Sequence, residues 1–209
     1  MTVETLAAAP AYPVRLEIDR PEHQSRLTNF PLGVGTFIRF ILLIPHLAIL
    51  YFFQLAAGVV YLIATVAILF SGRYPSGLFN FYVGYTRWQA NVYGYIVHLY
   101  DNYPPFSMDQ QPYPLRLEVD EPAKLSRLLN FPVFGFLMKA VLTIPHQIIL
   151  LFLILAVFVV LFIADFAILF TGSFPAGMHR FVVGVGRWST RVNAYIYALT
   201  DRYPPFSLS

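Results

Sequence analysis

The sequence predicts an all-α integral membrane protein built as a tandem duplication of a helical hairpin. Each hairpin pairs a kinked helix with a semi-polar one, giving about four transmembrane helices beside a small two-stranded β element at the cytoplasmic face. Hydrophobic residues make up 57% of the 209 residues and charged residues only 12%, whereas soluble domains carry about 25% charged residues. Each half of the chain also contains one long apolar stretch, and its motifs return about a hundred residues later, which indicates an internal repeat.

The recurring motifs set the boundaries of the two repeats. Residues 12–19 return as 113–120, and residues 101–107 return as 201–207. The first residues contain no basic segment followed by an apolar one, so we expect no secretory signal. We predict four segments: an N-terminal tail (1–11), membrane repeat 1 (12–108), a linker (109–112) and membrane repeat 2 (113–209).

Each repeat is predicted to begin with a β-strand. In residues 14–19 and again in 115–120, every second side chain is apolar and the side chains between them are charged, which is typical of a half-buried strand. A proline follows each stretch, at Pro21 and Pro122, and would end the strand. Because a single strand is not stable alone, we expect the two to pair with each other in antiparallel fashion, with opposite charges facing across the ladder.

The apolar run of repeat 1 covers residues 40–72, which contain no Asp, Glu, Lys or Arg. As one straight helix it would be about 50 Å long, well beyond a hydrocarbon core of about 30 Å. Proline disfavours helical geometry at the residue before it and removes a backbone donor. The prolines at 45 and 145 therefore predict short entry segments over 36–44 and 136–144, followed by membrane-spanning helices over 46–70 and 146–170.

A less apolar helix is expected after each run. The Gly-x-(Tyr/Phe)-Pro-x-Gly patterns at 72–77 and 172–177 are typical of a turn that ends one helix and begins another. The stretches 77–99 and 177–199 each hold a central arginine, which costs roughly 2.5–3.5 kcal/mol inside a bilayer. Lying flat in the interface is the alternative to crossing, and we favour crossing.

Basic residues precede each apolar run instead of occupying the turns. The turns hold only Arg73 and Arg180. Lys and Arg concentrate on the cytoplasmic side of membrane proteins, so four crossings with both termini cytoplasmic are predicted. The basic residues ahead of the two runs are Arg15, Arg20, Arg26, Arg39, Arg116, Lys124, Arg127 and Lys139.

One carboxylate interrupts the second apolar run. Asp165 stands where repeat 1 has Thr65, and an ionisable group inside a membrane is a functional candidate by default. If the helices fold back at the turn, Arg187 lies within reach of Asp165. We expect a structural ion pair between these two residues, with a proton or ion relay as the alternative. Thr65, Arg87, Asp165 and Arg187 would then form an intramembrane polar cluster.

Two histidines and two arginine-tryptophan pairs recur at equivalent positions. His46 and His146 each follow a proline, and could ligate a haem or a metal, but no other ligand residue accompanies them. We expect them to bond to backbone groups instead, and we expect no cofactor. The chain also has no cysteine, which excludes disulfides and thiolate metal sites. Four residues are candidates for lipid head-group contacts: Arg39, Lys139, Trp88 and Trp188. For the tryptophans, cation–π closure of the interface between the copies is the structural alternative.

Taken together, these motifs resemble a bacterial membrane family known as domain of unknown function 4389. The elements are Tyr-Pro-x-Arg-Leu, Ile-Pro-His, the glycine-proline turn, Arg-Trp and Asp-x-Tyr-Pro-Pro-Phe-Ser. Both repeats carry them, so the resemblance extends from about Tyr12 to Leu208. It implies a protein of the bacterial inner membrane and no particular activity.

The sequence contains no motif of a known catalytic class. It has no nucleophile elbow, no Walker loop and no dinucleotide fingerprint, so we do not expect an enzyme. We expect a non-enzymatic accessory or scaffold subunit that packs in a membrane complex or against itself. Its partners would be the bilayer and other membrane subunits, not nucleic acid. The alternative is a small transporter, channel or lipid-handling protein that uses the cleft between the repeats. A haem-binding electron-transfer subunit is a weaker alternative.

Overall fold

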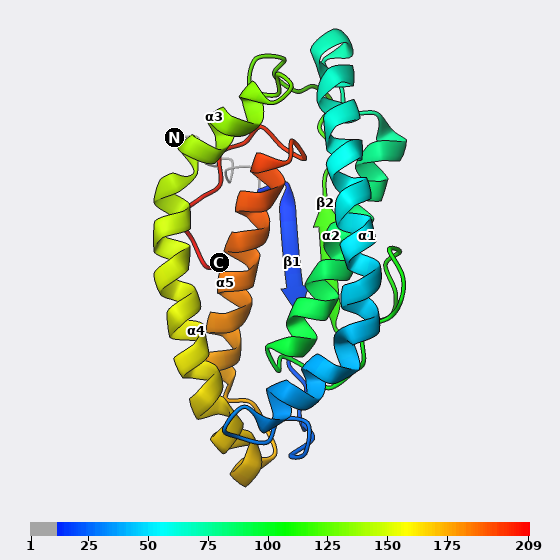
Figure 1. Cartoon of the computed structure of the whole chain (residues 1–209). Helices are drawn as coiled ribbons and strands as arrows, with labels where there is room; N and C mark the ends of the chain where they lie inside the picture. Colours follow the sequence, from blue (N-terminus) through cyan, green and yellow to red (C-terminus); the bar gives the residue numbers. More distant parts are fainter. Residues whose placement is uncertain (1–11) are drawn as a thin grey trace, which may run out of the picture.

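The computed structural model describes residues 12–209, so the predicted tail lies outside the described residues. Two helical hairpins flank a two-stranded sheet (Figure 1). Repeat 1 contributes β1 (Val14–Ile18), α1 (Val34–Ser71) and α2 (Ser76–Ile96). Repeat 2 contributes β2 (Leu115–Val119), α3 (Phe134–Leu142), α4 (Ile144–Thr171) and α5 (Ala176–Ile196). The predicted duplication of a helical hairpin and the predicted β element are therefore confirmed.

The two strands pair with each other in the predicted antiparallel arrangement. Leu16 lies opposite Leu117, and Arg15 lies opposite Glu118. The two leucines are buried, whereas the charged side chains between them form ion pairs on the outer face of the sheet. Arg15 donates to Asp120 at 2.7 and 2.8 Å and holds the pKa of that carboxyl below its ordinary value. We call this outer surface the charged ladder: Arg15, Glu17, Asp19, Arg116, Glu118 and Asp120.

The expected break at the proline occurs in only one repeat. Repeat 2 breaks at Thr143 into α3 and α4, but α1 continues through Pro45, so the predicted split is wrong for repeat 1. The physical reason lies two residues before the proline. The Thr143 hydroxyl donates to the carbonyl oxygens of Lys139 and Ala140 at 2.9 and 3.0 Å, and such bonds compete with the helical ladder. Repeat 1 has Leu43 at this position and cannot form them.

The helices form layers on the sheet. α2 packs on β2 and α5 packs on β1, while α1 lies against α2 and α4 against α5 (Figure 1). Most side chains in the middle of α2 and α5 are buried. α1 and α4 each bury only a narrow stripe and expose apolar side chains around the rest of their surface.

The two hairpins run in opposite directions. The Leu125 amide donates to the Gly72 carbonyl oxygen at 2.8 Å, and the Gln24 amide donates to the Gly172 carbonyl oxygen at the same distance. The tip of each hairpin therefore lies at the base of the other (Figure 1). The basic segments before α1 and α3 consequently lie at opposite ends of the molecule, which the orientation predicted from the sequence does not anticipate.

Two of the helices in residues 12–209 are long and apolar enough to cross a membrane. These are α1 and α4, with 38 and 28 residues. α2 and α5 have 21 residues each, but they do not reach the same apolar character. The four predicted crossings therefore stay a prediction.

Candidate functional site

Three of the recurring motifs meet in one aromatic cluster in each repeat. In repeat 1, His46 stacks on Phe106 with ring centroids 3.7 Å apart, and the Trp88 indole donates to His46 Nδ1 at 2.9 Å. The Tyr103 hydroxyl donates to the Leu42 carbonyl oxygen, one turn before His46. The second repeat builds the same cluster from His146, Trp188, Tyr203 and Phe206. We call these two sets the histidine clusters.

The histidine clusters do not fit the predicted ligand or lipid contacts. An indole N–H only donates, so Nδ1 of each imidazole accepts and the proton of the neutral ring lies on Nε2. Neither ring nitrogen then offers a free lone pair to a haem or a metal. Trp88 and Trp188 are only 4% and 5% exposed, so the predicted head-group contact is wrong for both. No group of three metal-ligating side chains occurs anywhere in residues 12–209.

Arg39 and Lys139 are also buried instead of reaching the membrane surface. Both are 0% exposed. Arg39 Nη2 lies 2.5 Å from Asp101 Oδ1 and donates to Asn29 Oδ1 at 2.8 Å, and Lys139 Nζ lies 3.1 Å from Asp201 Oδ1. The predicted head-group contacts are therefore wrong for these residues too, because Arg39 ties the start of α1, and Lys139 ties α3, to the end of the same repeat.

The predicted Asp165–Arg187 ion pair is wrong. Arg187 points to the sheet instead, where Nε donates to the Leu16 carbonyl oxygen at 2.9 Å and Nη1 to the Leu208 carbonyl oxygen at 3.0 Å. Arg87 does the same in repeat 1, with bonds to Met108 and Leu117 carbonyl oxygens. A two-stranded sheet leaves the outer edge of each strand unpaired, and these guanidinium groups satisfy that edge. The four residues of the predicted polar cluster are therefore not brought together.

Asp165 has a different partner, and that partner belongs to the other repeat. Its Oδ1 lies 2.6 Å from His98 Nδ1, and His98 Nε2 lies 3.1 Å from Thr36 Oγ1. His98 and Asp165 are 0% and 5% exposed. We call Thr36, His98 and Asp165 the polar junction, because it joins α4 to the first repeat.

The equivalent place at the other end of the molecule is built from aromatic rings. Phe136, Ala198 and Thr65 occupy the three corresponding positions, and the Thr65 hydroxyl bonds only within its own helix, to the Leu62 carbonyl oxygen. We call the surrounding rings of Tyr61, Phe136 and Tyr197 the aromatic junction; their centroids lie 5.6 to 6.1 Å apart.

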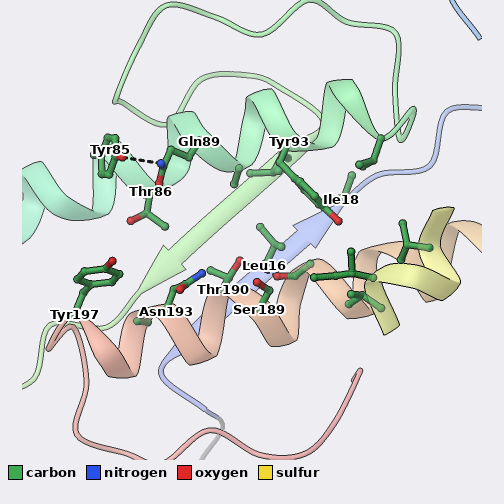
Figure 2. A pocket seen from close by; sticks show the side chains of 18 of the residues that line it. Leu16, Ile18, Tyr85, Thr86, Gln89, Tyr93, Ser189, Thr190, Asn193 and Tyr197 are labelled. Carbon is green, nitrogen blue, oxygen red and sulfur yellow. Dashed lines mark hydrogen bonds between the residues drawn. The ribbon is translucent and has the colours of Figure 1, made fainter. Parts of the chain in front are cut away.

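A cavity of about 420 Å³ lies between α2 and α5, with side chains of both strands on its wall. This volume is within the range of about 300–1,000 Å³ that is usual for small-molecule sites. In Figure 2, polar side chains of the two helices point toward each other across the opening. Tyr85 donates to Gln54, and Gln89 donates to the Tyr85 hydroxyl at 2.6 Å. The polar and aromatic lining residues are Gln54, Tyr82, Tyr85, Thr86, Gln89, Tyr93, Phe158, Ser189, Thr190, Asn193 and Tyr197.

Among residues 12–209, those that form the wall of this cavity include no Asp, Glu, Lys, Arg or His. Its apolar part includes Leu16 and Ile18 from the sheet, and Phe158 and Leu161 from α4. The cavity thus offers neutral hydrogen-bonding groups beside an apolar surface.

A cleft between the repeats was predicted from the sequence, but the residues that line the cavity and those of the polar junction were not, although the sequence carries a signal for each. His98 and Asp165 differ from their counterparts in the other repeat, Ala198 and Thr65. When two positions both differ between the repeats in this way, a contact between the two side chains is a natural explanation. The cavity wall departs in the same way, since Tyr85 and Gln89 correspond to Val185 and Ser189.

Together, the fold and these sites define a duplicated helical-hairpin protein with a neutral cavity between its repeats. The chain belongs to the family described as domain of unknown function (DUF4389), whose model matches twice, over residues 34–108 and 135–207. The predicted family and its two tandem copies are therefore confirmed, while both strands lie outside the matched stretches. No curated protein and no solved structure matches the chain.

Proposed function

We propose that this protein is a membrane-bound lipid-handling protein that holds an uncharged amphiphilic molecule in the cavity between its repeats. The observation that carries the proposal is the cavity wall, which combines amide and hydroxyl groups with apolar side chains and has no charged group among the residues that the structure describes. The lipid-handling function predicted as an alternative from the sequence is kept, but the cavity wall takes the place of the predicted intramembrane polar cluster.

The wall favours a ligand with a hydroxyl or carbonyl group at its polar end. Tyr85 and Gln89 on α2 line the same cavity as Thr190 and Asn193 on α5 (Figure 2), and all four offer neutral donors or acceptors. A charged head group would lose its hydration there without gaining a counter-ion, which is costly. The apolar part of the ligand would lie against Leu16 and the neighbouring apolar side chains.

The membrane association in this proposal is supported by the surface of the long helices. α1, α3 and α4 contain three charged residues, Arg39, Lys139 and Asp165, and all three are buried. The remaining exposed side chains include many large apolar ones, far more than a soluble monomer usually leaves in one patch. The bacterial inner membrane, as the particular membrane, rests on the family resemblance and stays part of the proposal.

A non-enzymatic accessory or scaffold subunit is the second candidate, and the same exposed faces of α1 and α4 favour it. Partner subunits would cover these faces in place of lipid tails. Purification in mild detergent at native expression level separates the two candidates. Stoichiometric recovery with a larger complex supports the accessory subunit, and recovery as a lone chain with bound lipid supports lipid handling.

Lipid extraction tests the proposed ligand directly. The protein is purified from membranes in mild detergent and its bound lipids are identified by mass spectrometry. We expect about one neutral lipid per chain, as for a single pocket of this size. Ala90→Phe places a ring in the cavity wall and should abolish this retention. Ala56→Phe, on α1 and outside the wall, should not. Retention of anionic phospholipid only, or equal retention in both variants, would contradict the proposal.

A further inference from the structure

We infer that the protein lies flat in one leaflet of a bilayer, with α1 and α4 in the lipid and the charged ladder in water. The inference rests on the membrane association proposed above and does not depend on the ligand. It assigns the exposed faces of α1, α3 and α4 to one occupant, the acyl chains and glycerol region of a single leaflet.

The first argument is that the molecule has an uncharged face and a charged face on opposite sides. The inner side of the sheet, with Leu16 and Leu117, is buried under α2 and α5, which pack in turn against α1 and α4. The outer side of the sheet carries the charged ladder, in which Glu17 and Glu118 are 66% and 67% exposed. The surface is therefore charged on the outer side of the sheet and apolar on the side of α1 and α4. The change from charged to apolar runs across the molecule, perpendicular to the helix axes.

The second argument is that an upright orientation would bring the charged ladder into the hydrocarbon. The strands run alongside α2 and α5 (Figure 1), and the mid-helix residues Arg87 and Arg187 bind the carbonyl oxygens of Leu117 and Leu16. The ladder thus lies near the middle of the helices. Charged side chains at mid-membrane depth are costly, and the ladder contains six of them.

The third argument comes from length. α1 has 38 residues, which at 1.5 Å per residue gives a helix of about 57 Å. This is nearly twice a hydrocarbon core of about 30 Å. A helix that lies in the plane of the leaflet is not limited by its thickness.

The fourth argument is the direction of the hairpins. Their ends lie at opposite ends of the molecule, so an upright molecule would place the two basic segments on opposite sides of the membrane. The two repeats are related by an approximate two-fold axis. In the flat orientation this axis is perpendicular to the bilayer, so equivalent residues of both repeats lie at the same depth. Both basic segments then face the same water phase, which agrees with the distribution of Lys and Arg in membrane proteins.

The flat orientation also gives the cavity an entrance from the leaflet. The wall reaches Gln54 on α1 and Phe158 on α4, and Phe158 is 64% exposed. A lipid could then enter sideways, without its polar end crossing the bilayer.

Cysteine labelling tests this orientation, and the chain has no cysteine of its own. Single cysteines are placed at the hairpin tips (Ser76→Cys and Ala176→Cys), on the ladder (Glu118→Cys) and on the apolar face (Phe52→Cys). Each variant is exposed to a membrane-impermeant maleimide in intact spheroplasts and in inverted membrane vesicles. A flat molecule labels at both tips and at the ladder from the same side. The apolar-face cysteine reacts only after detergent is added.

The opposite pattern would overturn the inference. An upright molecule labels at its two tips from opposite sides, and at the ladder from neither side. Recovery of the unmodified chain in the soluble fraction would refute membrane association itself, and with it the proposed function. Failure of the flat orientation is therefore distinguishable from failure of the proposed membrane association.

Discussion

The polar junction and the aromatic junction occupy equivalent places in the two halves of the molecule but are built from opposite chemistry. One joins the repeats through His98 and Asp165, 2.6 Å apart; the other joins them through edge-on and tilted ring contacts among Tyr61, Phe136 and Tyr197. All three polar positions differ from their counterparts together. A buried imidazole or carboxylate is costly without its partner, so such residues are expected as a set.

The histidine clusters give the opposite result, because both repeats contain the same four residue types in the same geometry. Their stacking distances agree, at 3.7 and 3.8 Å. These clusters close each repeat on itself, whereas the junctions and the cavity lie between the repeats. The shared motifs therefore hold the fold of one repeat, and the positions of the junctions that differ lie where the two repeats meet.

Removing the carboxylate of the polar junction should have the largest effect on stability. Asp165→Ala leaves His98 buried without its partner and should lower the free energy of unfolding by about 3 kcal/mol. The matched variant Thr65→Ala removes a hydroxyl that bonds only within its own helix and should cost less than about 1 kcal/mol. Denaturant unfolding of the detergent-solubilised protein measures both. Equal losses would show that the two junctions do not differ energetically.

A double-mutant cycle sharpens the same comparison. His98→Ala and Asp165→Ala should be strongly non-additive, with a coupling energy of about 1–3 kcal/mol, because each removes the partner of the other. The corresponding pair Thr65→Ala and Ala198→Gly should be additive, since no hydrogen bond joins these two residues. Additivity in the His98–Asp165 pair would contradict the assignment of this contact.

The histidine clusters should respond alike in the two repeats. Trp88→Phe and Trp188→Phe each remove the donor to a buried imidazole nitrogen, which should cost about 1–2 kcal/mol. We expect the two losses of unfolding free energy to agree within about 0.5 kcal/mol. A clear difference between them would mean that one cluster serves more than the fold of its repeat.

The charged ladder should give the smallest effect, and it depends on pH. The Arg15 guanidinium lowers the pKa of Asp120, so the ionised carboxylate stabilises the folded state. This contribution is complete above the unfolded pKa of about 3.9 and is lost as the pH falls through the lower folded pKa. For an exposed pair it should amount to about 0.5 kcal/mol. The difference in stability between the unmodified chain and Asp120→Asn should disappear in acid, and a difference that grows instead would contradict this sign.

Local features of the fold could be predicted from the sequence because spacing within a short stretch determines them. The alternation around Leu16 and Leu117 predicts the strands and their pairing, and the glycine-proline patterns predict the turns. The opposite direction of the hairpins also follows from the antiparallel pairing of the strands. Since each hairpin follows its own strand, two antiparallel strands lead into hairpins that point in opposite directions. The predicted membrane orientation was instead based on the distribution of basic residues, which does not take the opposite direction of the hairpins into account.

The site could be predicted less well because its contacts join distant parts of the chain. Arg39 stands at a position typical of lipid contact, but its carboxylate partner is Asp101, 62 residues later. Asp165 lies opposite His98 of the other repeat and not opposite Arg187 of its own hairpin, since the arginine satisfies the open edge of a strand. Such choices depend on how the two repeats pack, which spacing within one repeat does not determine.

Native mass spectrometry of the Tyr85→Phe, Gln89→Leu double variant is the most direct test of the neutral cavity as a ligand site. The variant removes the hydrogen-bonding pair from the wall while leaving both junctions and both histidine clusters intact. We predict that the unmodified chain carries a bound neutral lipid and that the variant lacks it, with little change in melting temperature. Retention of the same bound mass at the same occupancy would contradict the assignment of the cavity.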